Sequence, residues 1–104
     1  MSRKNAPLMG ESIQWLGLAV VSLMGHDQDR VYVVIKEDED FLCLVDGHYR
    51  PLAKPKKKRK KHVKVLGKAE KSTRLDPHEL FAMHPKSGEA DKIIRDFIKS
   101  QLKQ

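Results

Sequence analysis

Three consecutive segments decide the fold: LAVVSLM at residues 18–24, GHDQD at residues 25–29 and RVYVVIK at residues 30–36. The first segment is almost entirely apolar, and the polar second segment interrupts it with a glycine, as a turn between two strands does. In the third segment apolar residues alternate along the chain, which places three of them on one face of a strand: Val31, Val33 and Ile35. The sequence therefore predicts two strands joined by a polar turn, which is a β-hairpin.

Three further strands are predicted downstream of this hairpin, at residues 41–45, 48–51 and 61–66. The acidic segment 37–40 connects the second strand to the third. The pair Asp46-Gly47 follows the third strand and is among the commonest sequences in tight type I′ hairpin turns. Short strands with such turns predict a mainly β fold, a small five-stranded SH3-like barrel whose curvature hides the strand edges.

The period of the sequence changes after residue 67. Asp76 and Pro77 are typical of a helix start. Apolar residues recur every three or four positions from Ala90 to Leu102, which predicts a second, amphipathic helix. The predicted organisation has three parts: a flexible N-terminal arm at 1–14, a barrel with its basic segment at 15–67, and a linker with a two-helix C-terminal extension at 68–104. We expect the barrel to fold without the two ends.

Positive charge is concentrated in residues 54–64, KPKKKRKKHVK, which contain eight of the 21 lysine and arginine residues and none of the 14 acidic residues. The chain of 104 residues has a net charge of +7, and the other 93 residues carry 13 basic against 14 acidic side chains, a net charge of −1. Charge gathered in this way is typical of proteins that bind polyanions. The alternative is a solvated run that touches nothing specific. Predicted strands before and after the run favour the first interpretation, because they would hold it in place.

The composition disfavours several other classes of protein. Cys43 is the single cysteine, so no intrachain disulfide can form, and we expect a reducing, cytoplasmic location. The histidines have no metal-ligand spacing supported by cysteines, and we expect neither a metal nor a cofactor. No apolar run approaches the roughly 18 residues of a membrane span, so we expect no membrane partner. No nucleophile with its base, paired carboxylates or metal cluster is apparent, and we expect that the protein is not an enzyme.

The segment GLAVVSLMGHDQDRVYVV at residues 17–34 looks like a KOW motif. Together with VDGHYRPL at residues 45–52 and the basic segment through His62, it resembles the small bacterial KOW-domain RNA-binding proteins related to a eukaryotic-type large-subunit ribosomal protein. This resemblance implies an SH3-like barrel that contacts RNA through the loop between the first two strands and through the basic segment. His26 and Asp29 depart from the motif, which has a basic residue and a second glycine there. We expect Asp29 to preserve the turn, because aspartate tolerates left-handed backbone geometry.

Charge and resemblance together predict a set of RNA-binding residues: Gly25, His26, Asp27, Arg30, Arg50, Lys54, Lys56, Lys57, Lys58, Arg59, Lys60, Lys61, His62 and Lys64. Arg30 and Arg50 flank turns, where a guanidinium could contact a phosphate or a base, although each could instead form a surface ion pair. Tyr32 and Tyr49 could stack on unpaired bases or simply fill core and surface positions. We expect the acidic segment 37–40 to lie away from bound RNA, because its carboxylates would repel phosphates.

Two functions of different classes follow from these observations. The first is an RNA-binding accessory factor, associated with the ribosome or with translation, that reads A-form shape and phosphates rather than sequence. Its expected partners are ribosomal or other structured RNA, with the ribosome or ribosomal proteins as further candidates. The alternative is an SH3-like protein-interaction module whose lysines only steer it towards acidic surfaces. Charge alone also allows binding to double-stranded DNA.

Overall fold

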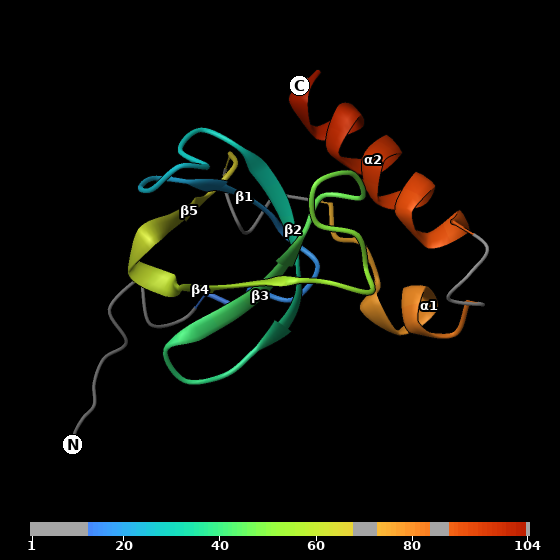
Figure 1. The fold of residues 1–104 in the computed structure, drawn as a ribbon, viewed down its shortest axis with the longest axis horizontal. Helices are drawn as coiled ribbons and strands as arrows, with labels where there is room; N and C mark the ends of the chain where they lie inside the picture. The colour runs from blue at the N-terminus through green and yellow to red at the C-terminus, as the bar shows by residue number, and fades with distance from the viewer. Residues whose placement is uncertain (1–12, 68–72, 84–87, 104) are drawn as a thin grey trace.

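The computed structural model describes residues 13–67, 73–83 and 88–103. Five strands form one antiparallel sheet in the order β4-β3-β2-β1-β5 (Figure 1). The strands have these bounds: β1 Ala19–Ser22, β2 Val31–Glu37, β3 Phe41–Val45, β4 Lys56–Arg59 and β5 Val63–Val65. The predicted mainly β fold of five strands with a helical C-terminal part is confirmed.

The sheet curls into a small barrel because its two edge strands are neighbours in the sequence. Only the short 3₁₀ turn η2, Lys60–His62, separates β4 from β5. The chain from Arg59 to Val63 can span at most about 14 Å, whereas a flat sheet would set its first and fifth strands about 19 Å apart. The backbone N–H of Leu23 also donates to the carbonyl oxygen of His62 at 2.8 Å, which ties the turn to the end of β1.

The predicted hairpin of β1 and β2 is confirmed, and β2 is buried on both of its faces. Tyr32 and Val34 belong to a first hydrophobic cluster inside the barrel, which also contains Trp15 from the segment before β1. Val33 and Ile35 belong to a second cluster on the opposite face. Val33 and Ile35 thus lie together on one face, as the sequence predicts, and the other residues of the second cluster cover that face.

The fourth strand was predicted incorrectly. Residues 48–51 form a loop, because the carboxylate of Asp46 accepts hydrogen bonds from the backbone N–H groups of His48 and Arg50 at 2.9 and 2.8 Å. These donors are therefore not available to a neighbouring strand. The fourth strand is instead formed by the first part of the basic run, Lys56–Arg59, which pairs with β3. The fifth strand is shorter than predicted but lies within residues 61–66.

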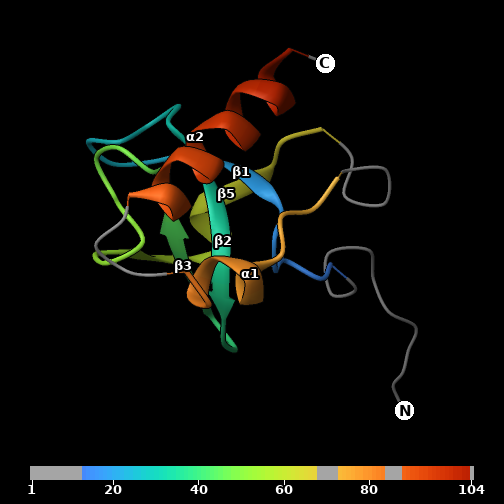
Figure 2. The ribbon, with the colours of Figure 1, turned by 90° about the vertical axis from the view of Figure 1, so that its right-hand side faces the viewer.

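Two helices cover one face of the sheet, α1 at Pro77–Phe81 and α2 at Glu89–Leu102 (Figure 2). The predicted helix start at Asp76 is confirmed, since its side chain accepts a hydrogen bond from the backbone N–H of His78 at 2.9 Å. The apolar sides of both helices enter the second cluster, where the following residues are buried together: Val33, Ile35, Val45, Leu80, Ala90 and Ile94. The helices and the sheet therefore share a hydrophobic core.

Polar contacts also attach the C-terminal part to the barrel. Asp91 of α2 accepts a hydrogen bond from the backbone N–H of Leu52 at 2.8 Å, and Arg95 donates to the carbonyl oxygen of Gly47 at 2.6 Å. Most of the predicted arm and linker lie outside the described residues, whereas the end of the first helix, at Phe81, lies within them. Ile13, at the end of the predicted arm, is partly buried against the first cluster. Neither described helix has the length and apolar content that crossing a bilayer requires.

Candidate nucleic-acid interface

Strand β4 divides the basic run between two sides of the sheet. Residues directly opposite each other in an antiparallel pair project to the same face. Lys56 and Lys58 lie opposite Leu44 and Leu42, which are buried in the first cluster. The other two residues of the strand lie opposite residues of the other face. Lys57 is opposite Cys43, and Arg59 is opposite Phe41. The alternation of the strand therefore places consecutive cations in different environments.

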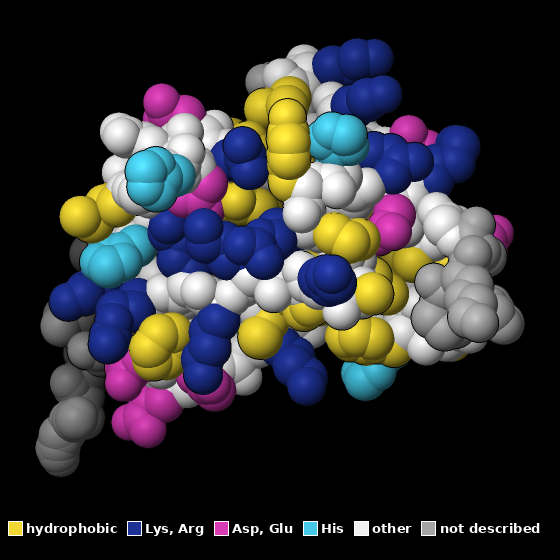
Figure 3. Space-filling view, viewed as in Figure 1, with side chains coloured by type: hydrophobic (Ala, Val, Ile, Leu, Met, Phe, Trp, Pro, Cys, Tyr) yellow, Lys and Arg dark blue, Asp and Glu magenta, His cyan; other side chains and the backbone are white. Residues whose placement is uncertain are grey.

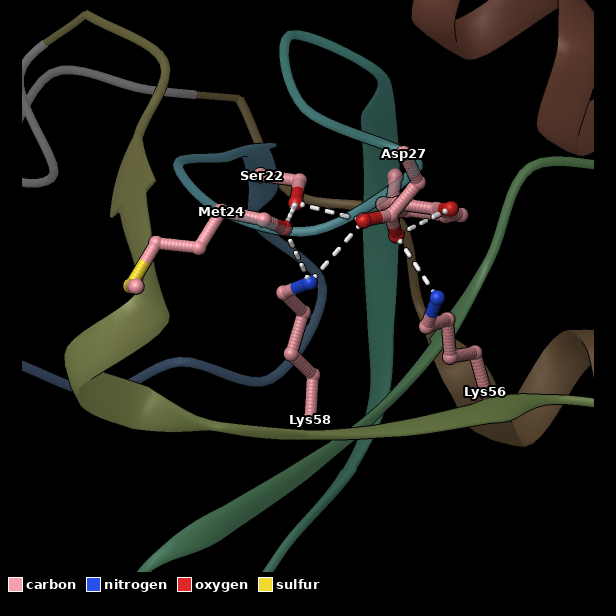
Figure 4. A network of polar contacts seen from close by, with 6 residues as sticks. Ser22, Met24, Asp27, Lys56 and Lys58 are labelled. Atoms are coloured by element: carbon pink, nitrogen blue, oxygen red, sulfur yellow. Dashed lines mark hydrogen bonds and ion pairs between the residues drawn. The ribbon is translucent and has the colours of Figure 1, made fainter.

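The two inward lysines converge on one buried carboxylate in the loop between β1 and β2 (Figure 4). Asp27 is only 4% exposed, and its oxygens lie 2.9 Å from the Nζ of Lys58 and 3.0 Å from the Nζ of Lys56. It also accepts hydrogen bonds from the hydroxyls of Tyr32, at 2.7 Å, and Ser22, at 3.0 Å. The two lysine contacts fasten the loop to β4, because both lysines belong to that strand, about thirty positions further along the chain.

The contacts of this carboxylate keep it ionised. Burial by itself would raise the pKa of Asp27, but the hydrogen bonds from Lys58, Tyr32, Lys56 and Ser22 outweigh it and hold the pKa well below its ordinary value. The same arrangement raises the pKa of Tyr32 to about 12, through burial of the phenol, its hydrogen bond to Asp27 and the negative charge beside it. Both inward lysines therefore face a permanent negative charge at neutral pH.

The remaining cations of the run are more available to a ligand. Lys57 and Arg59 are exposed and lie over the ring of Phe41, each 4.7 Å from its centroid. Together with three other exposed lysines they form what we call the exposed basic set: Lys54, Lys57, Arg59, Lys61 and Lys64. None of its members forms an ion pair with another residue that the structure describes. Figure 3 shows lysine and arginine side chains gathered across the middle of the face that carries β4.

The acidic segment 37–40 adjoins one end of the basic run. Lys60 forms an ion pair with Glu37 at 3.0 Å, and its backbone N–H donates to the carbonyl oxygen of Asp40 at 2.9 Å. Part of the charge of the run is therefore neutralised here, and the carboxylates bound the candidate surface on this side. His62, in the same turn, is half-buried.

The loop between β1 and β2 has the backbone geometry that the sequence predicts. Asp29 adopts a left-handed conformation with φ of 72°, the geometry that its residue type was expected to tolerate. Gly25 also has a positive φ, and His26 is exposed. Asp27 was expected to contact RNA, but the structure buries its carboxylate among protein donors. Its role there is to hold the loop in place.

The two turn arginines and the two tyrosines differ in their surroundings. The guanidinium carbon of Arg30 lies 4.0 Å from the ring centroid of Tyr49, which is 63% exposed. The ring of His48 meets that of Tyr49 edge to face, with centroids 4.4 Å apart. Tyr32 is fully buried and cannot stack on a base. Arg50 is half-buried, and its backbone closes the loop that Asp46 begins.

Sequence reasoning missed both the buried network and the aromatic contact between the two loops. One signal pointed to the network: Asp27 is an acidic residue inside a loop expected to meet phosphates, where its charge would be unfavourable unless cations covered it.

Within residues 13–67, 73–83 and 88–103, no group of three or more His, Cys, Asp or Glu residues could hold a metal ion.

Comparison of the sequence with protein-family models found no matching family, and comparison with curated proteins found no match.

Proposed function

We propose that the protein binds RNA through the exposed basic set and the loop between β1 and β2, as an accessory factor associated with the ribosome or with translation in the cytoplasm. The observation that carries this proposal is that the exposed basic set has no ion-pair partner among the described residues, although the chain has 14 acidic side chains. A cation without a counterion on the protein releases condensed ions when it neutralises a phosphate.

The scaffold supports phosphate binding because it fixes where these cations lie. Lys57 and Arg59 belong to a strand that is paired with β3, and Lys64 belongs to β5. The inward Lys56 and Lys58 are already neutralised in large part by Asp27 and contribute less to the attraction. The proposal therefore narrows the predicted contacts within the run to its exposed members.

The salt dependence of binding tests the proposal. Replacement of Lys57, Arg59 and Lys61 by glutamine removes three candidate phosphate contacts. With a short single-stranded RNA, the slope of log affinity against log salt should become shallower by about 2, since each contact contributes roughly 0.7. The control variant carries glutamine at three lysines of the C-terminal helix region and loses the same charge: Lys92, Lys99 and Lys103.

A shallower slope in the first variant and a nearly unchanged slope in the control would support the proposal. An unchanged slope in the first variant, with native tryptophan fluorescence, would refute it and favour the protein-interaction module. Copurified nucleic acid would separate the two functions independently. It would be detected by the ratio of absorbance at the wavelengths of bases and of aromatic side chains, and ribonuclease should remove it if it is RNA.

A further inference from the structure

Tyr49 is the most exposed large apolar side chain among the described residues. Its ring is nevertheless held by two neighbours, with the guanidinium of Arg30 4.0 Å from its centroid and the ring of His48 packed edge to face at 4.4 Å. Solvent-exposed side chains ordinarily sample several rotamers, and ordering them on binding costs free energy. A tyrosine that is both exposed and held in place avoids much of that cost.

The backbone on both sides of this contact is also fixed. The loop that carries Tyr49 is closed by the carboxylate of Asp46 and is attached to α2 by the hydrogen bond from Arg95 to Gly47. Arg30 follows the loop that Asp27 fastens to β4, and its own carbonyl oxygen accepts a hydrogen bond from Ser22 at 2.9 Å. The contact between Arg30 and Tyr49 thus joins two loops that are each anchored to the rest of the protein.

We propose that Arg30, His48 and Tyr49 form a stacking site for an unpaired nucleobase, so that the RNA bound by this protein presents a single-stranded segment at this place. The inference rests on the proposed function and adds to it the form of RNA that is recognised. Aromatic rings and arginine planes stack on unpaired bases, whereas the bases of an A-form helix are already stacked inside it. Tyr49 offers the ring, and Arg30 adds a cation that favours both the base and its phosphate.

A second aromatic residue, Phe41, is a weaker candidate for the same role. Two cations, Lys57 and Arg59, lie over its ring, and the ring itself is only half-exposed. Two cations therefore compete with a base for this ring, whereas one cation, Arg30, lies over the ring of Tyr49. The greater exposure of Tyr49 is therefore the observation that locates the site.

Binding of two RNA probes with the same number of phosphates tests the inference. One is a single-stranded oligouridine, and the other has the same ribose-phosphate backbone without bases. We expect the wild-type protein to prefer the oligouridine. Tyr49→Leu should weaken oligouridine binding by about five- to 150-fold, the range for removing one stacking aromatic side chain, and should leave binding of the abasic strand nearly unchanged. Tyr49→Phe keeps the ring and should retain the preference.

The matched control is Phe81→Leu, which removes a half-exposed aromatic ring from α1 and should not alter binding of either probe. In proton NMR spectra, the ring signals of Tyr49 should move upfield on addition of oligouridine and remain in place on addition of the abasic strand. If the wild-type protein binds neither probe, the proposed function is wrong. If it binds both probes equally, or if Tyr49→Leu weakens both equally, RNA binding stands and the stacking site is refuted.

Discussion

Replacement of Asp27 by asparagine is the sharpest test of the network that fastens the loop to β4. The substitution keeps the shape of the side chain but removes the charge that Lys56 and Lys58 face. It also replaces one acceptor oxygen by an amide group that can only donate. We therefore expect the folded state to lose stability although no apolar contact is removed.

The magnitude follows from the burial of each partner. Removing one member of a buried ion pair costs about 3–5 kcal/mol, because the other charge stays buried without compensation. The side chain of Lys58 is 9% exposed and falls in this class, whereas that of Lys56 is 27% exposed and can turn towards water. The hydroxyls of Ser22 and Tyr32 donate to different oxygens of Asp27, so only one of them keeps its acceptor, while the other can accept a hydrogen bond from the new amide group. We expect a loss of about 3 kcal/mol, a large part of the roughly 5–15 kcal/mol that stabilises a domain.

Urea denaturation followed by tryptophan fluorescence measures this loss. Trp15 is the only tryptophan and lies in the first hydrophobic cluster, so its emission reports unfolding of the barrel. With a urea dependence of about 1.5 kcal/mol/M, the midpoint should fall by about 2 M. Asp29→Asn is the matched control, because it removes one carboxylate of the same loop at an exposed position where asparagine also accepts positive φ. A loss for Asp27→Asn as small as that of the control would refute the reasoning.

The pH dependence supplies a second readout from the same two proteins. The pKa of Asp27 in the folded state lies below its ordinary value of about 3.9, so its contribution to stability is present above that pH and is lost as the pH falls towards the folded-state pKa. The difference in stability between wild type and Asp27→Asn should therefore be constant near neutral pH and should narrow below about pH 4. A difference that stays constant to lower pH would contradict the assigned cause.

Two further substitutions test how the helices are attached to the barrel. Ile94→Ala should cost about 2–5 kcal/mol in urea denaturation, because the side chain of Ile94 on α2 is fully buried against the sheet. Leu102→Ala, at an exposed position of the same helix, should cost less than about 0.5 kcal/mol. Equal losses would show that the second cluster does not support the barrel. Gly47→Ala should destabilise more than Gly67→Ala by about 1–3 kcal/mol, since both glycines have positive φ but only at Gly47 would the added Cβ collide with the carbonyl oxygen of Asp91. If the two alanine variants are equally stable, α2 does not press on this loop.

Much of the fold could be predicted because it depends on local patterns. The hairpin follows from apolar segments on both sides of a polar turn, and the limits of the third strand, Phe41–Val45, were predicted correctly. The helix start at Asp76 could be predicted because a capping side chain acts within its own turn. The left-handed backbone of Asp29 was predicted from the permissive geometry of its residue type.

The fourth strand could not be predicted in the same way. The sequence from Lys56 to Arg59 has neither the β-branched and aromatic residues nor the apolar alternation typical of strands. It is extended because β3 pairs with it and because Asp27 neutralises its inward lysines. Residues 48–51 do not form a strand because the side chain of Asp46 accepts hydrogen bonds from the backbone N–H groups of His48 and Arg50. From the sequence alone, Asp46 is recognised only as half of an Asp-Gly pair that favours a tight turn.

The sequence by itself determined the fold class, the hairpin, the start of each helix and the concentration of positive charge in residues 54–64, because each depends on composition or on neighbours a few positions apart. Only the tertiary structure decided which of these charges remain available. Strand pairing turns alternate cations to opposite faces, and the inward pair meets a carboxylate about thirty positions earlier in the chain. The same folding brings Arg30 onto Tyr49. Such contacts join residues far apart in the chain, and no local pattern of residue types specifies them.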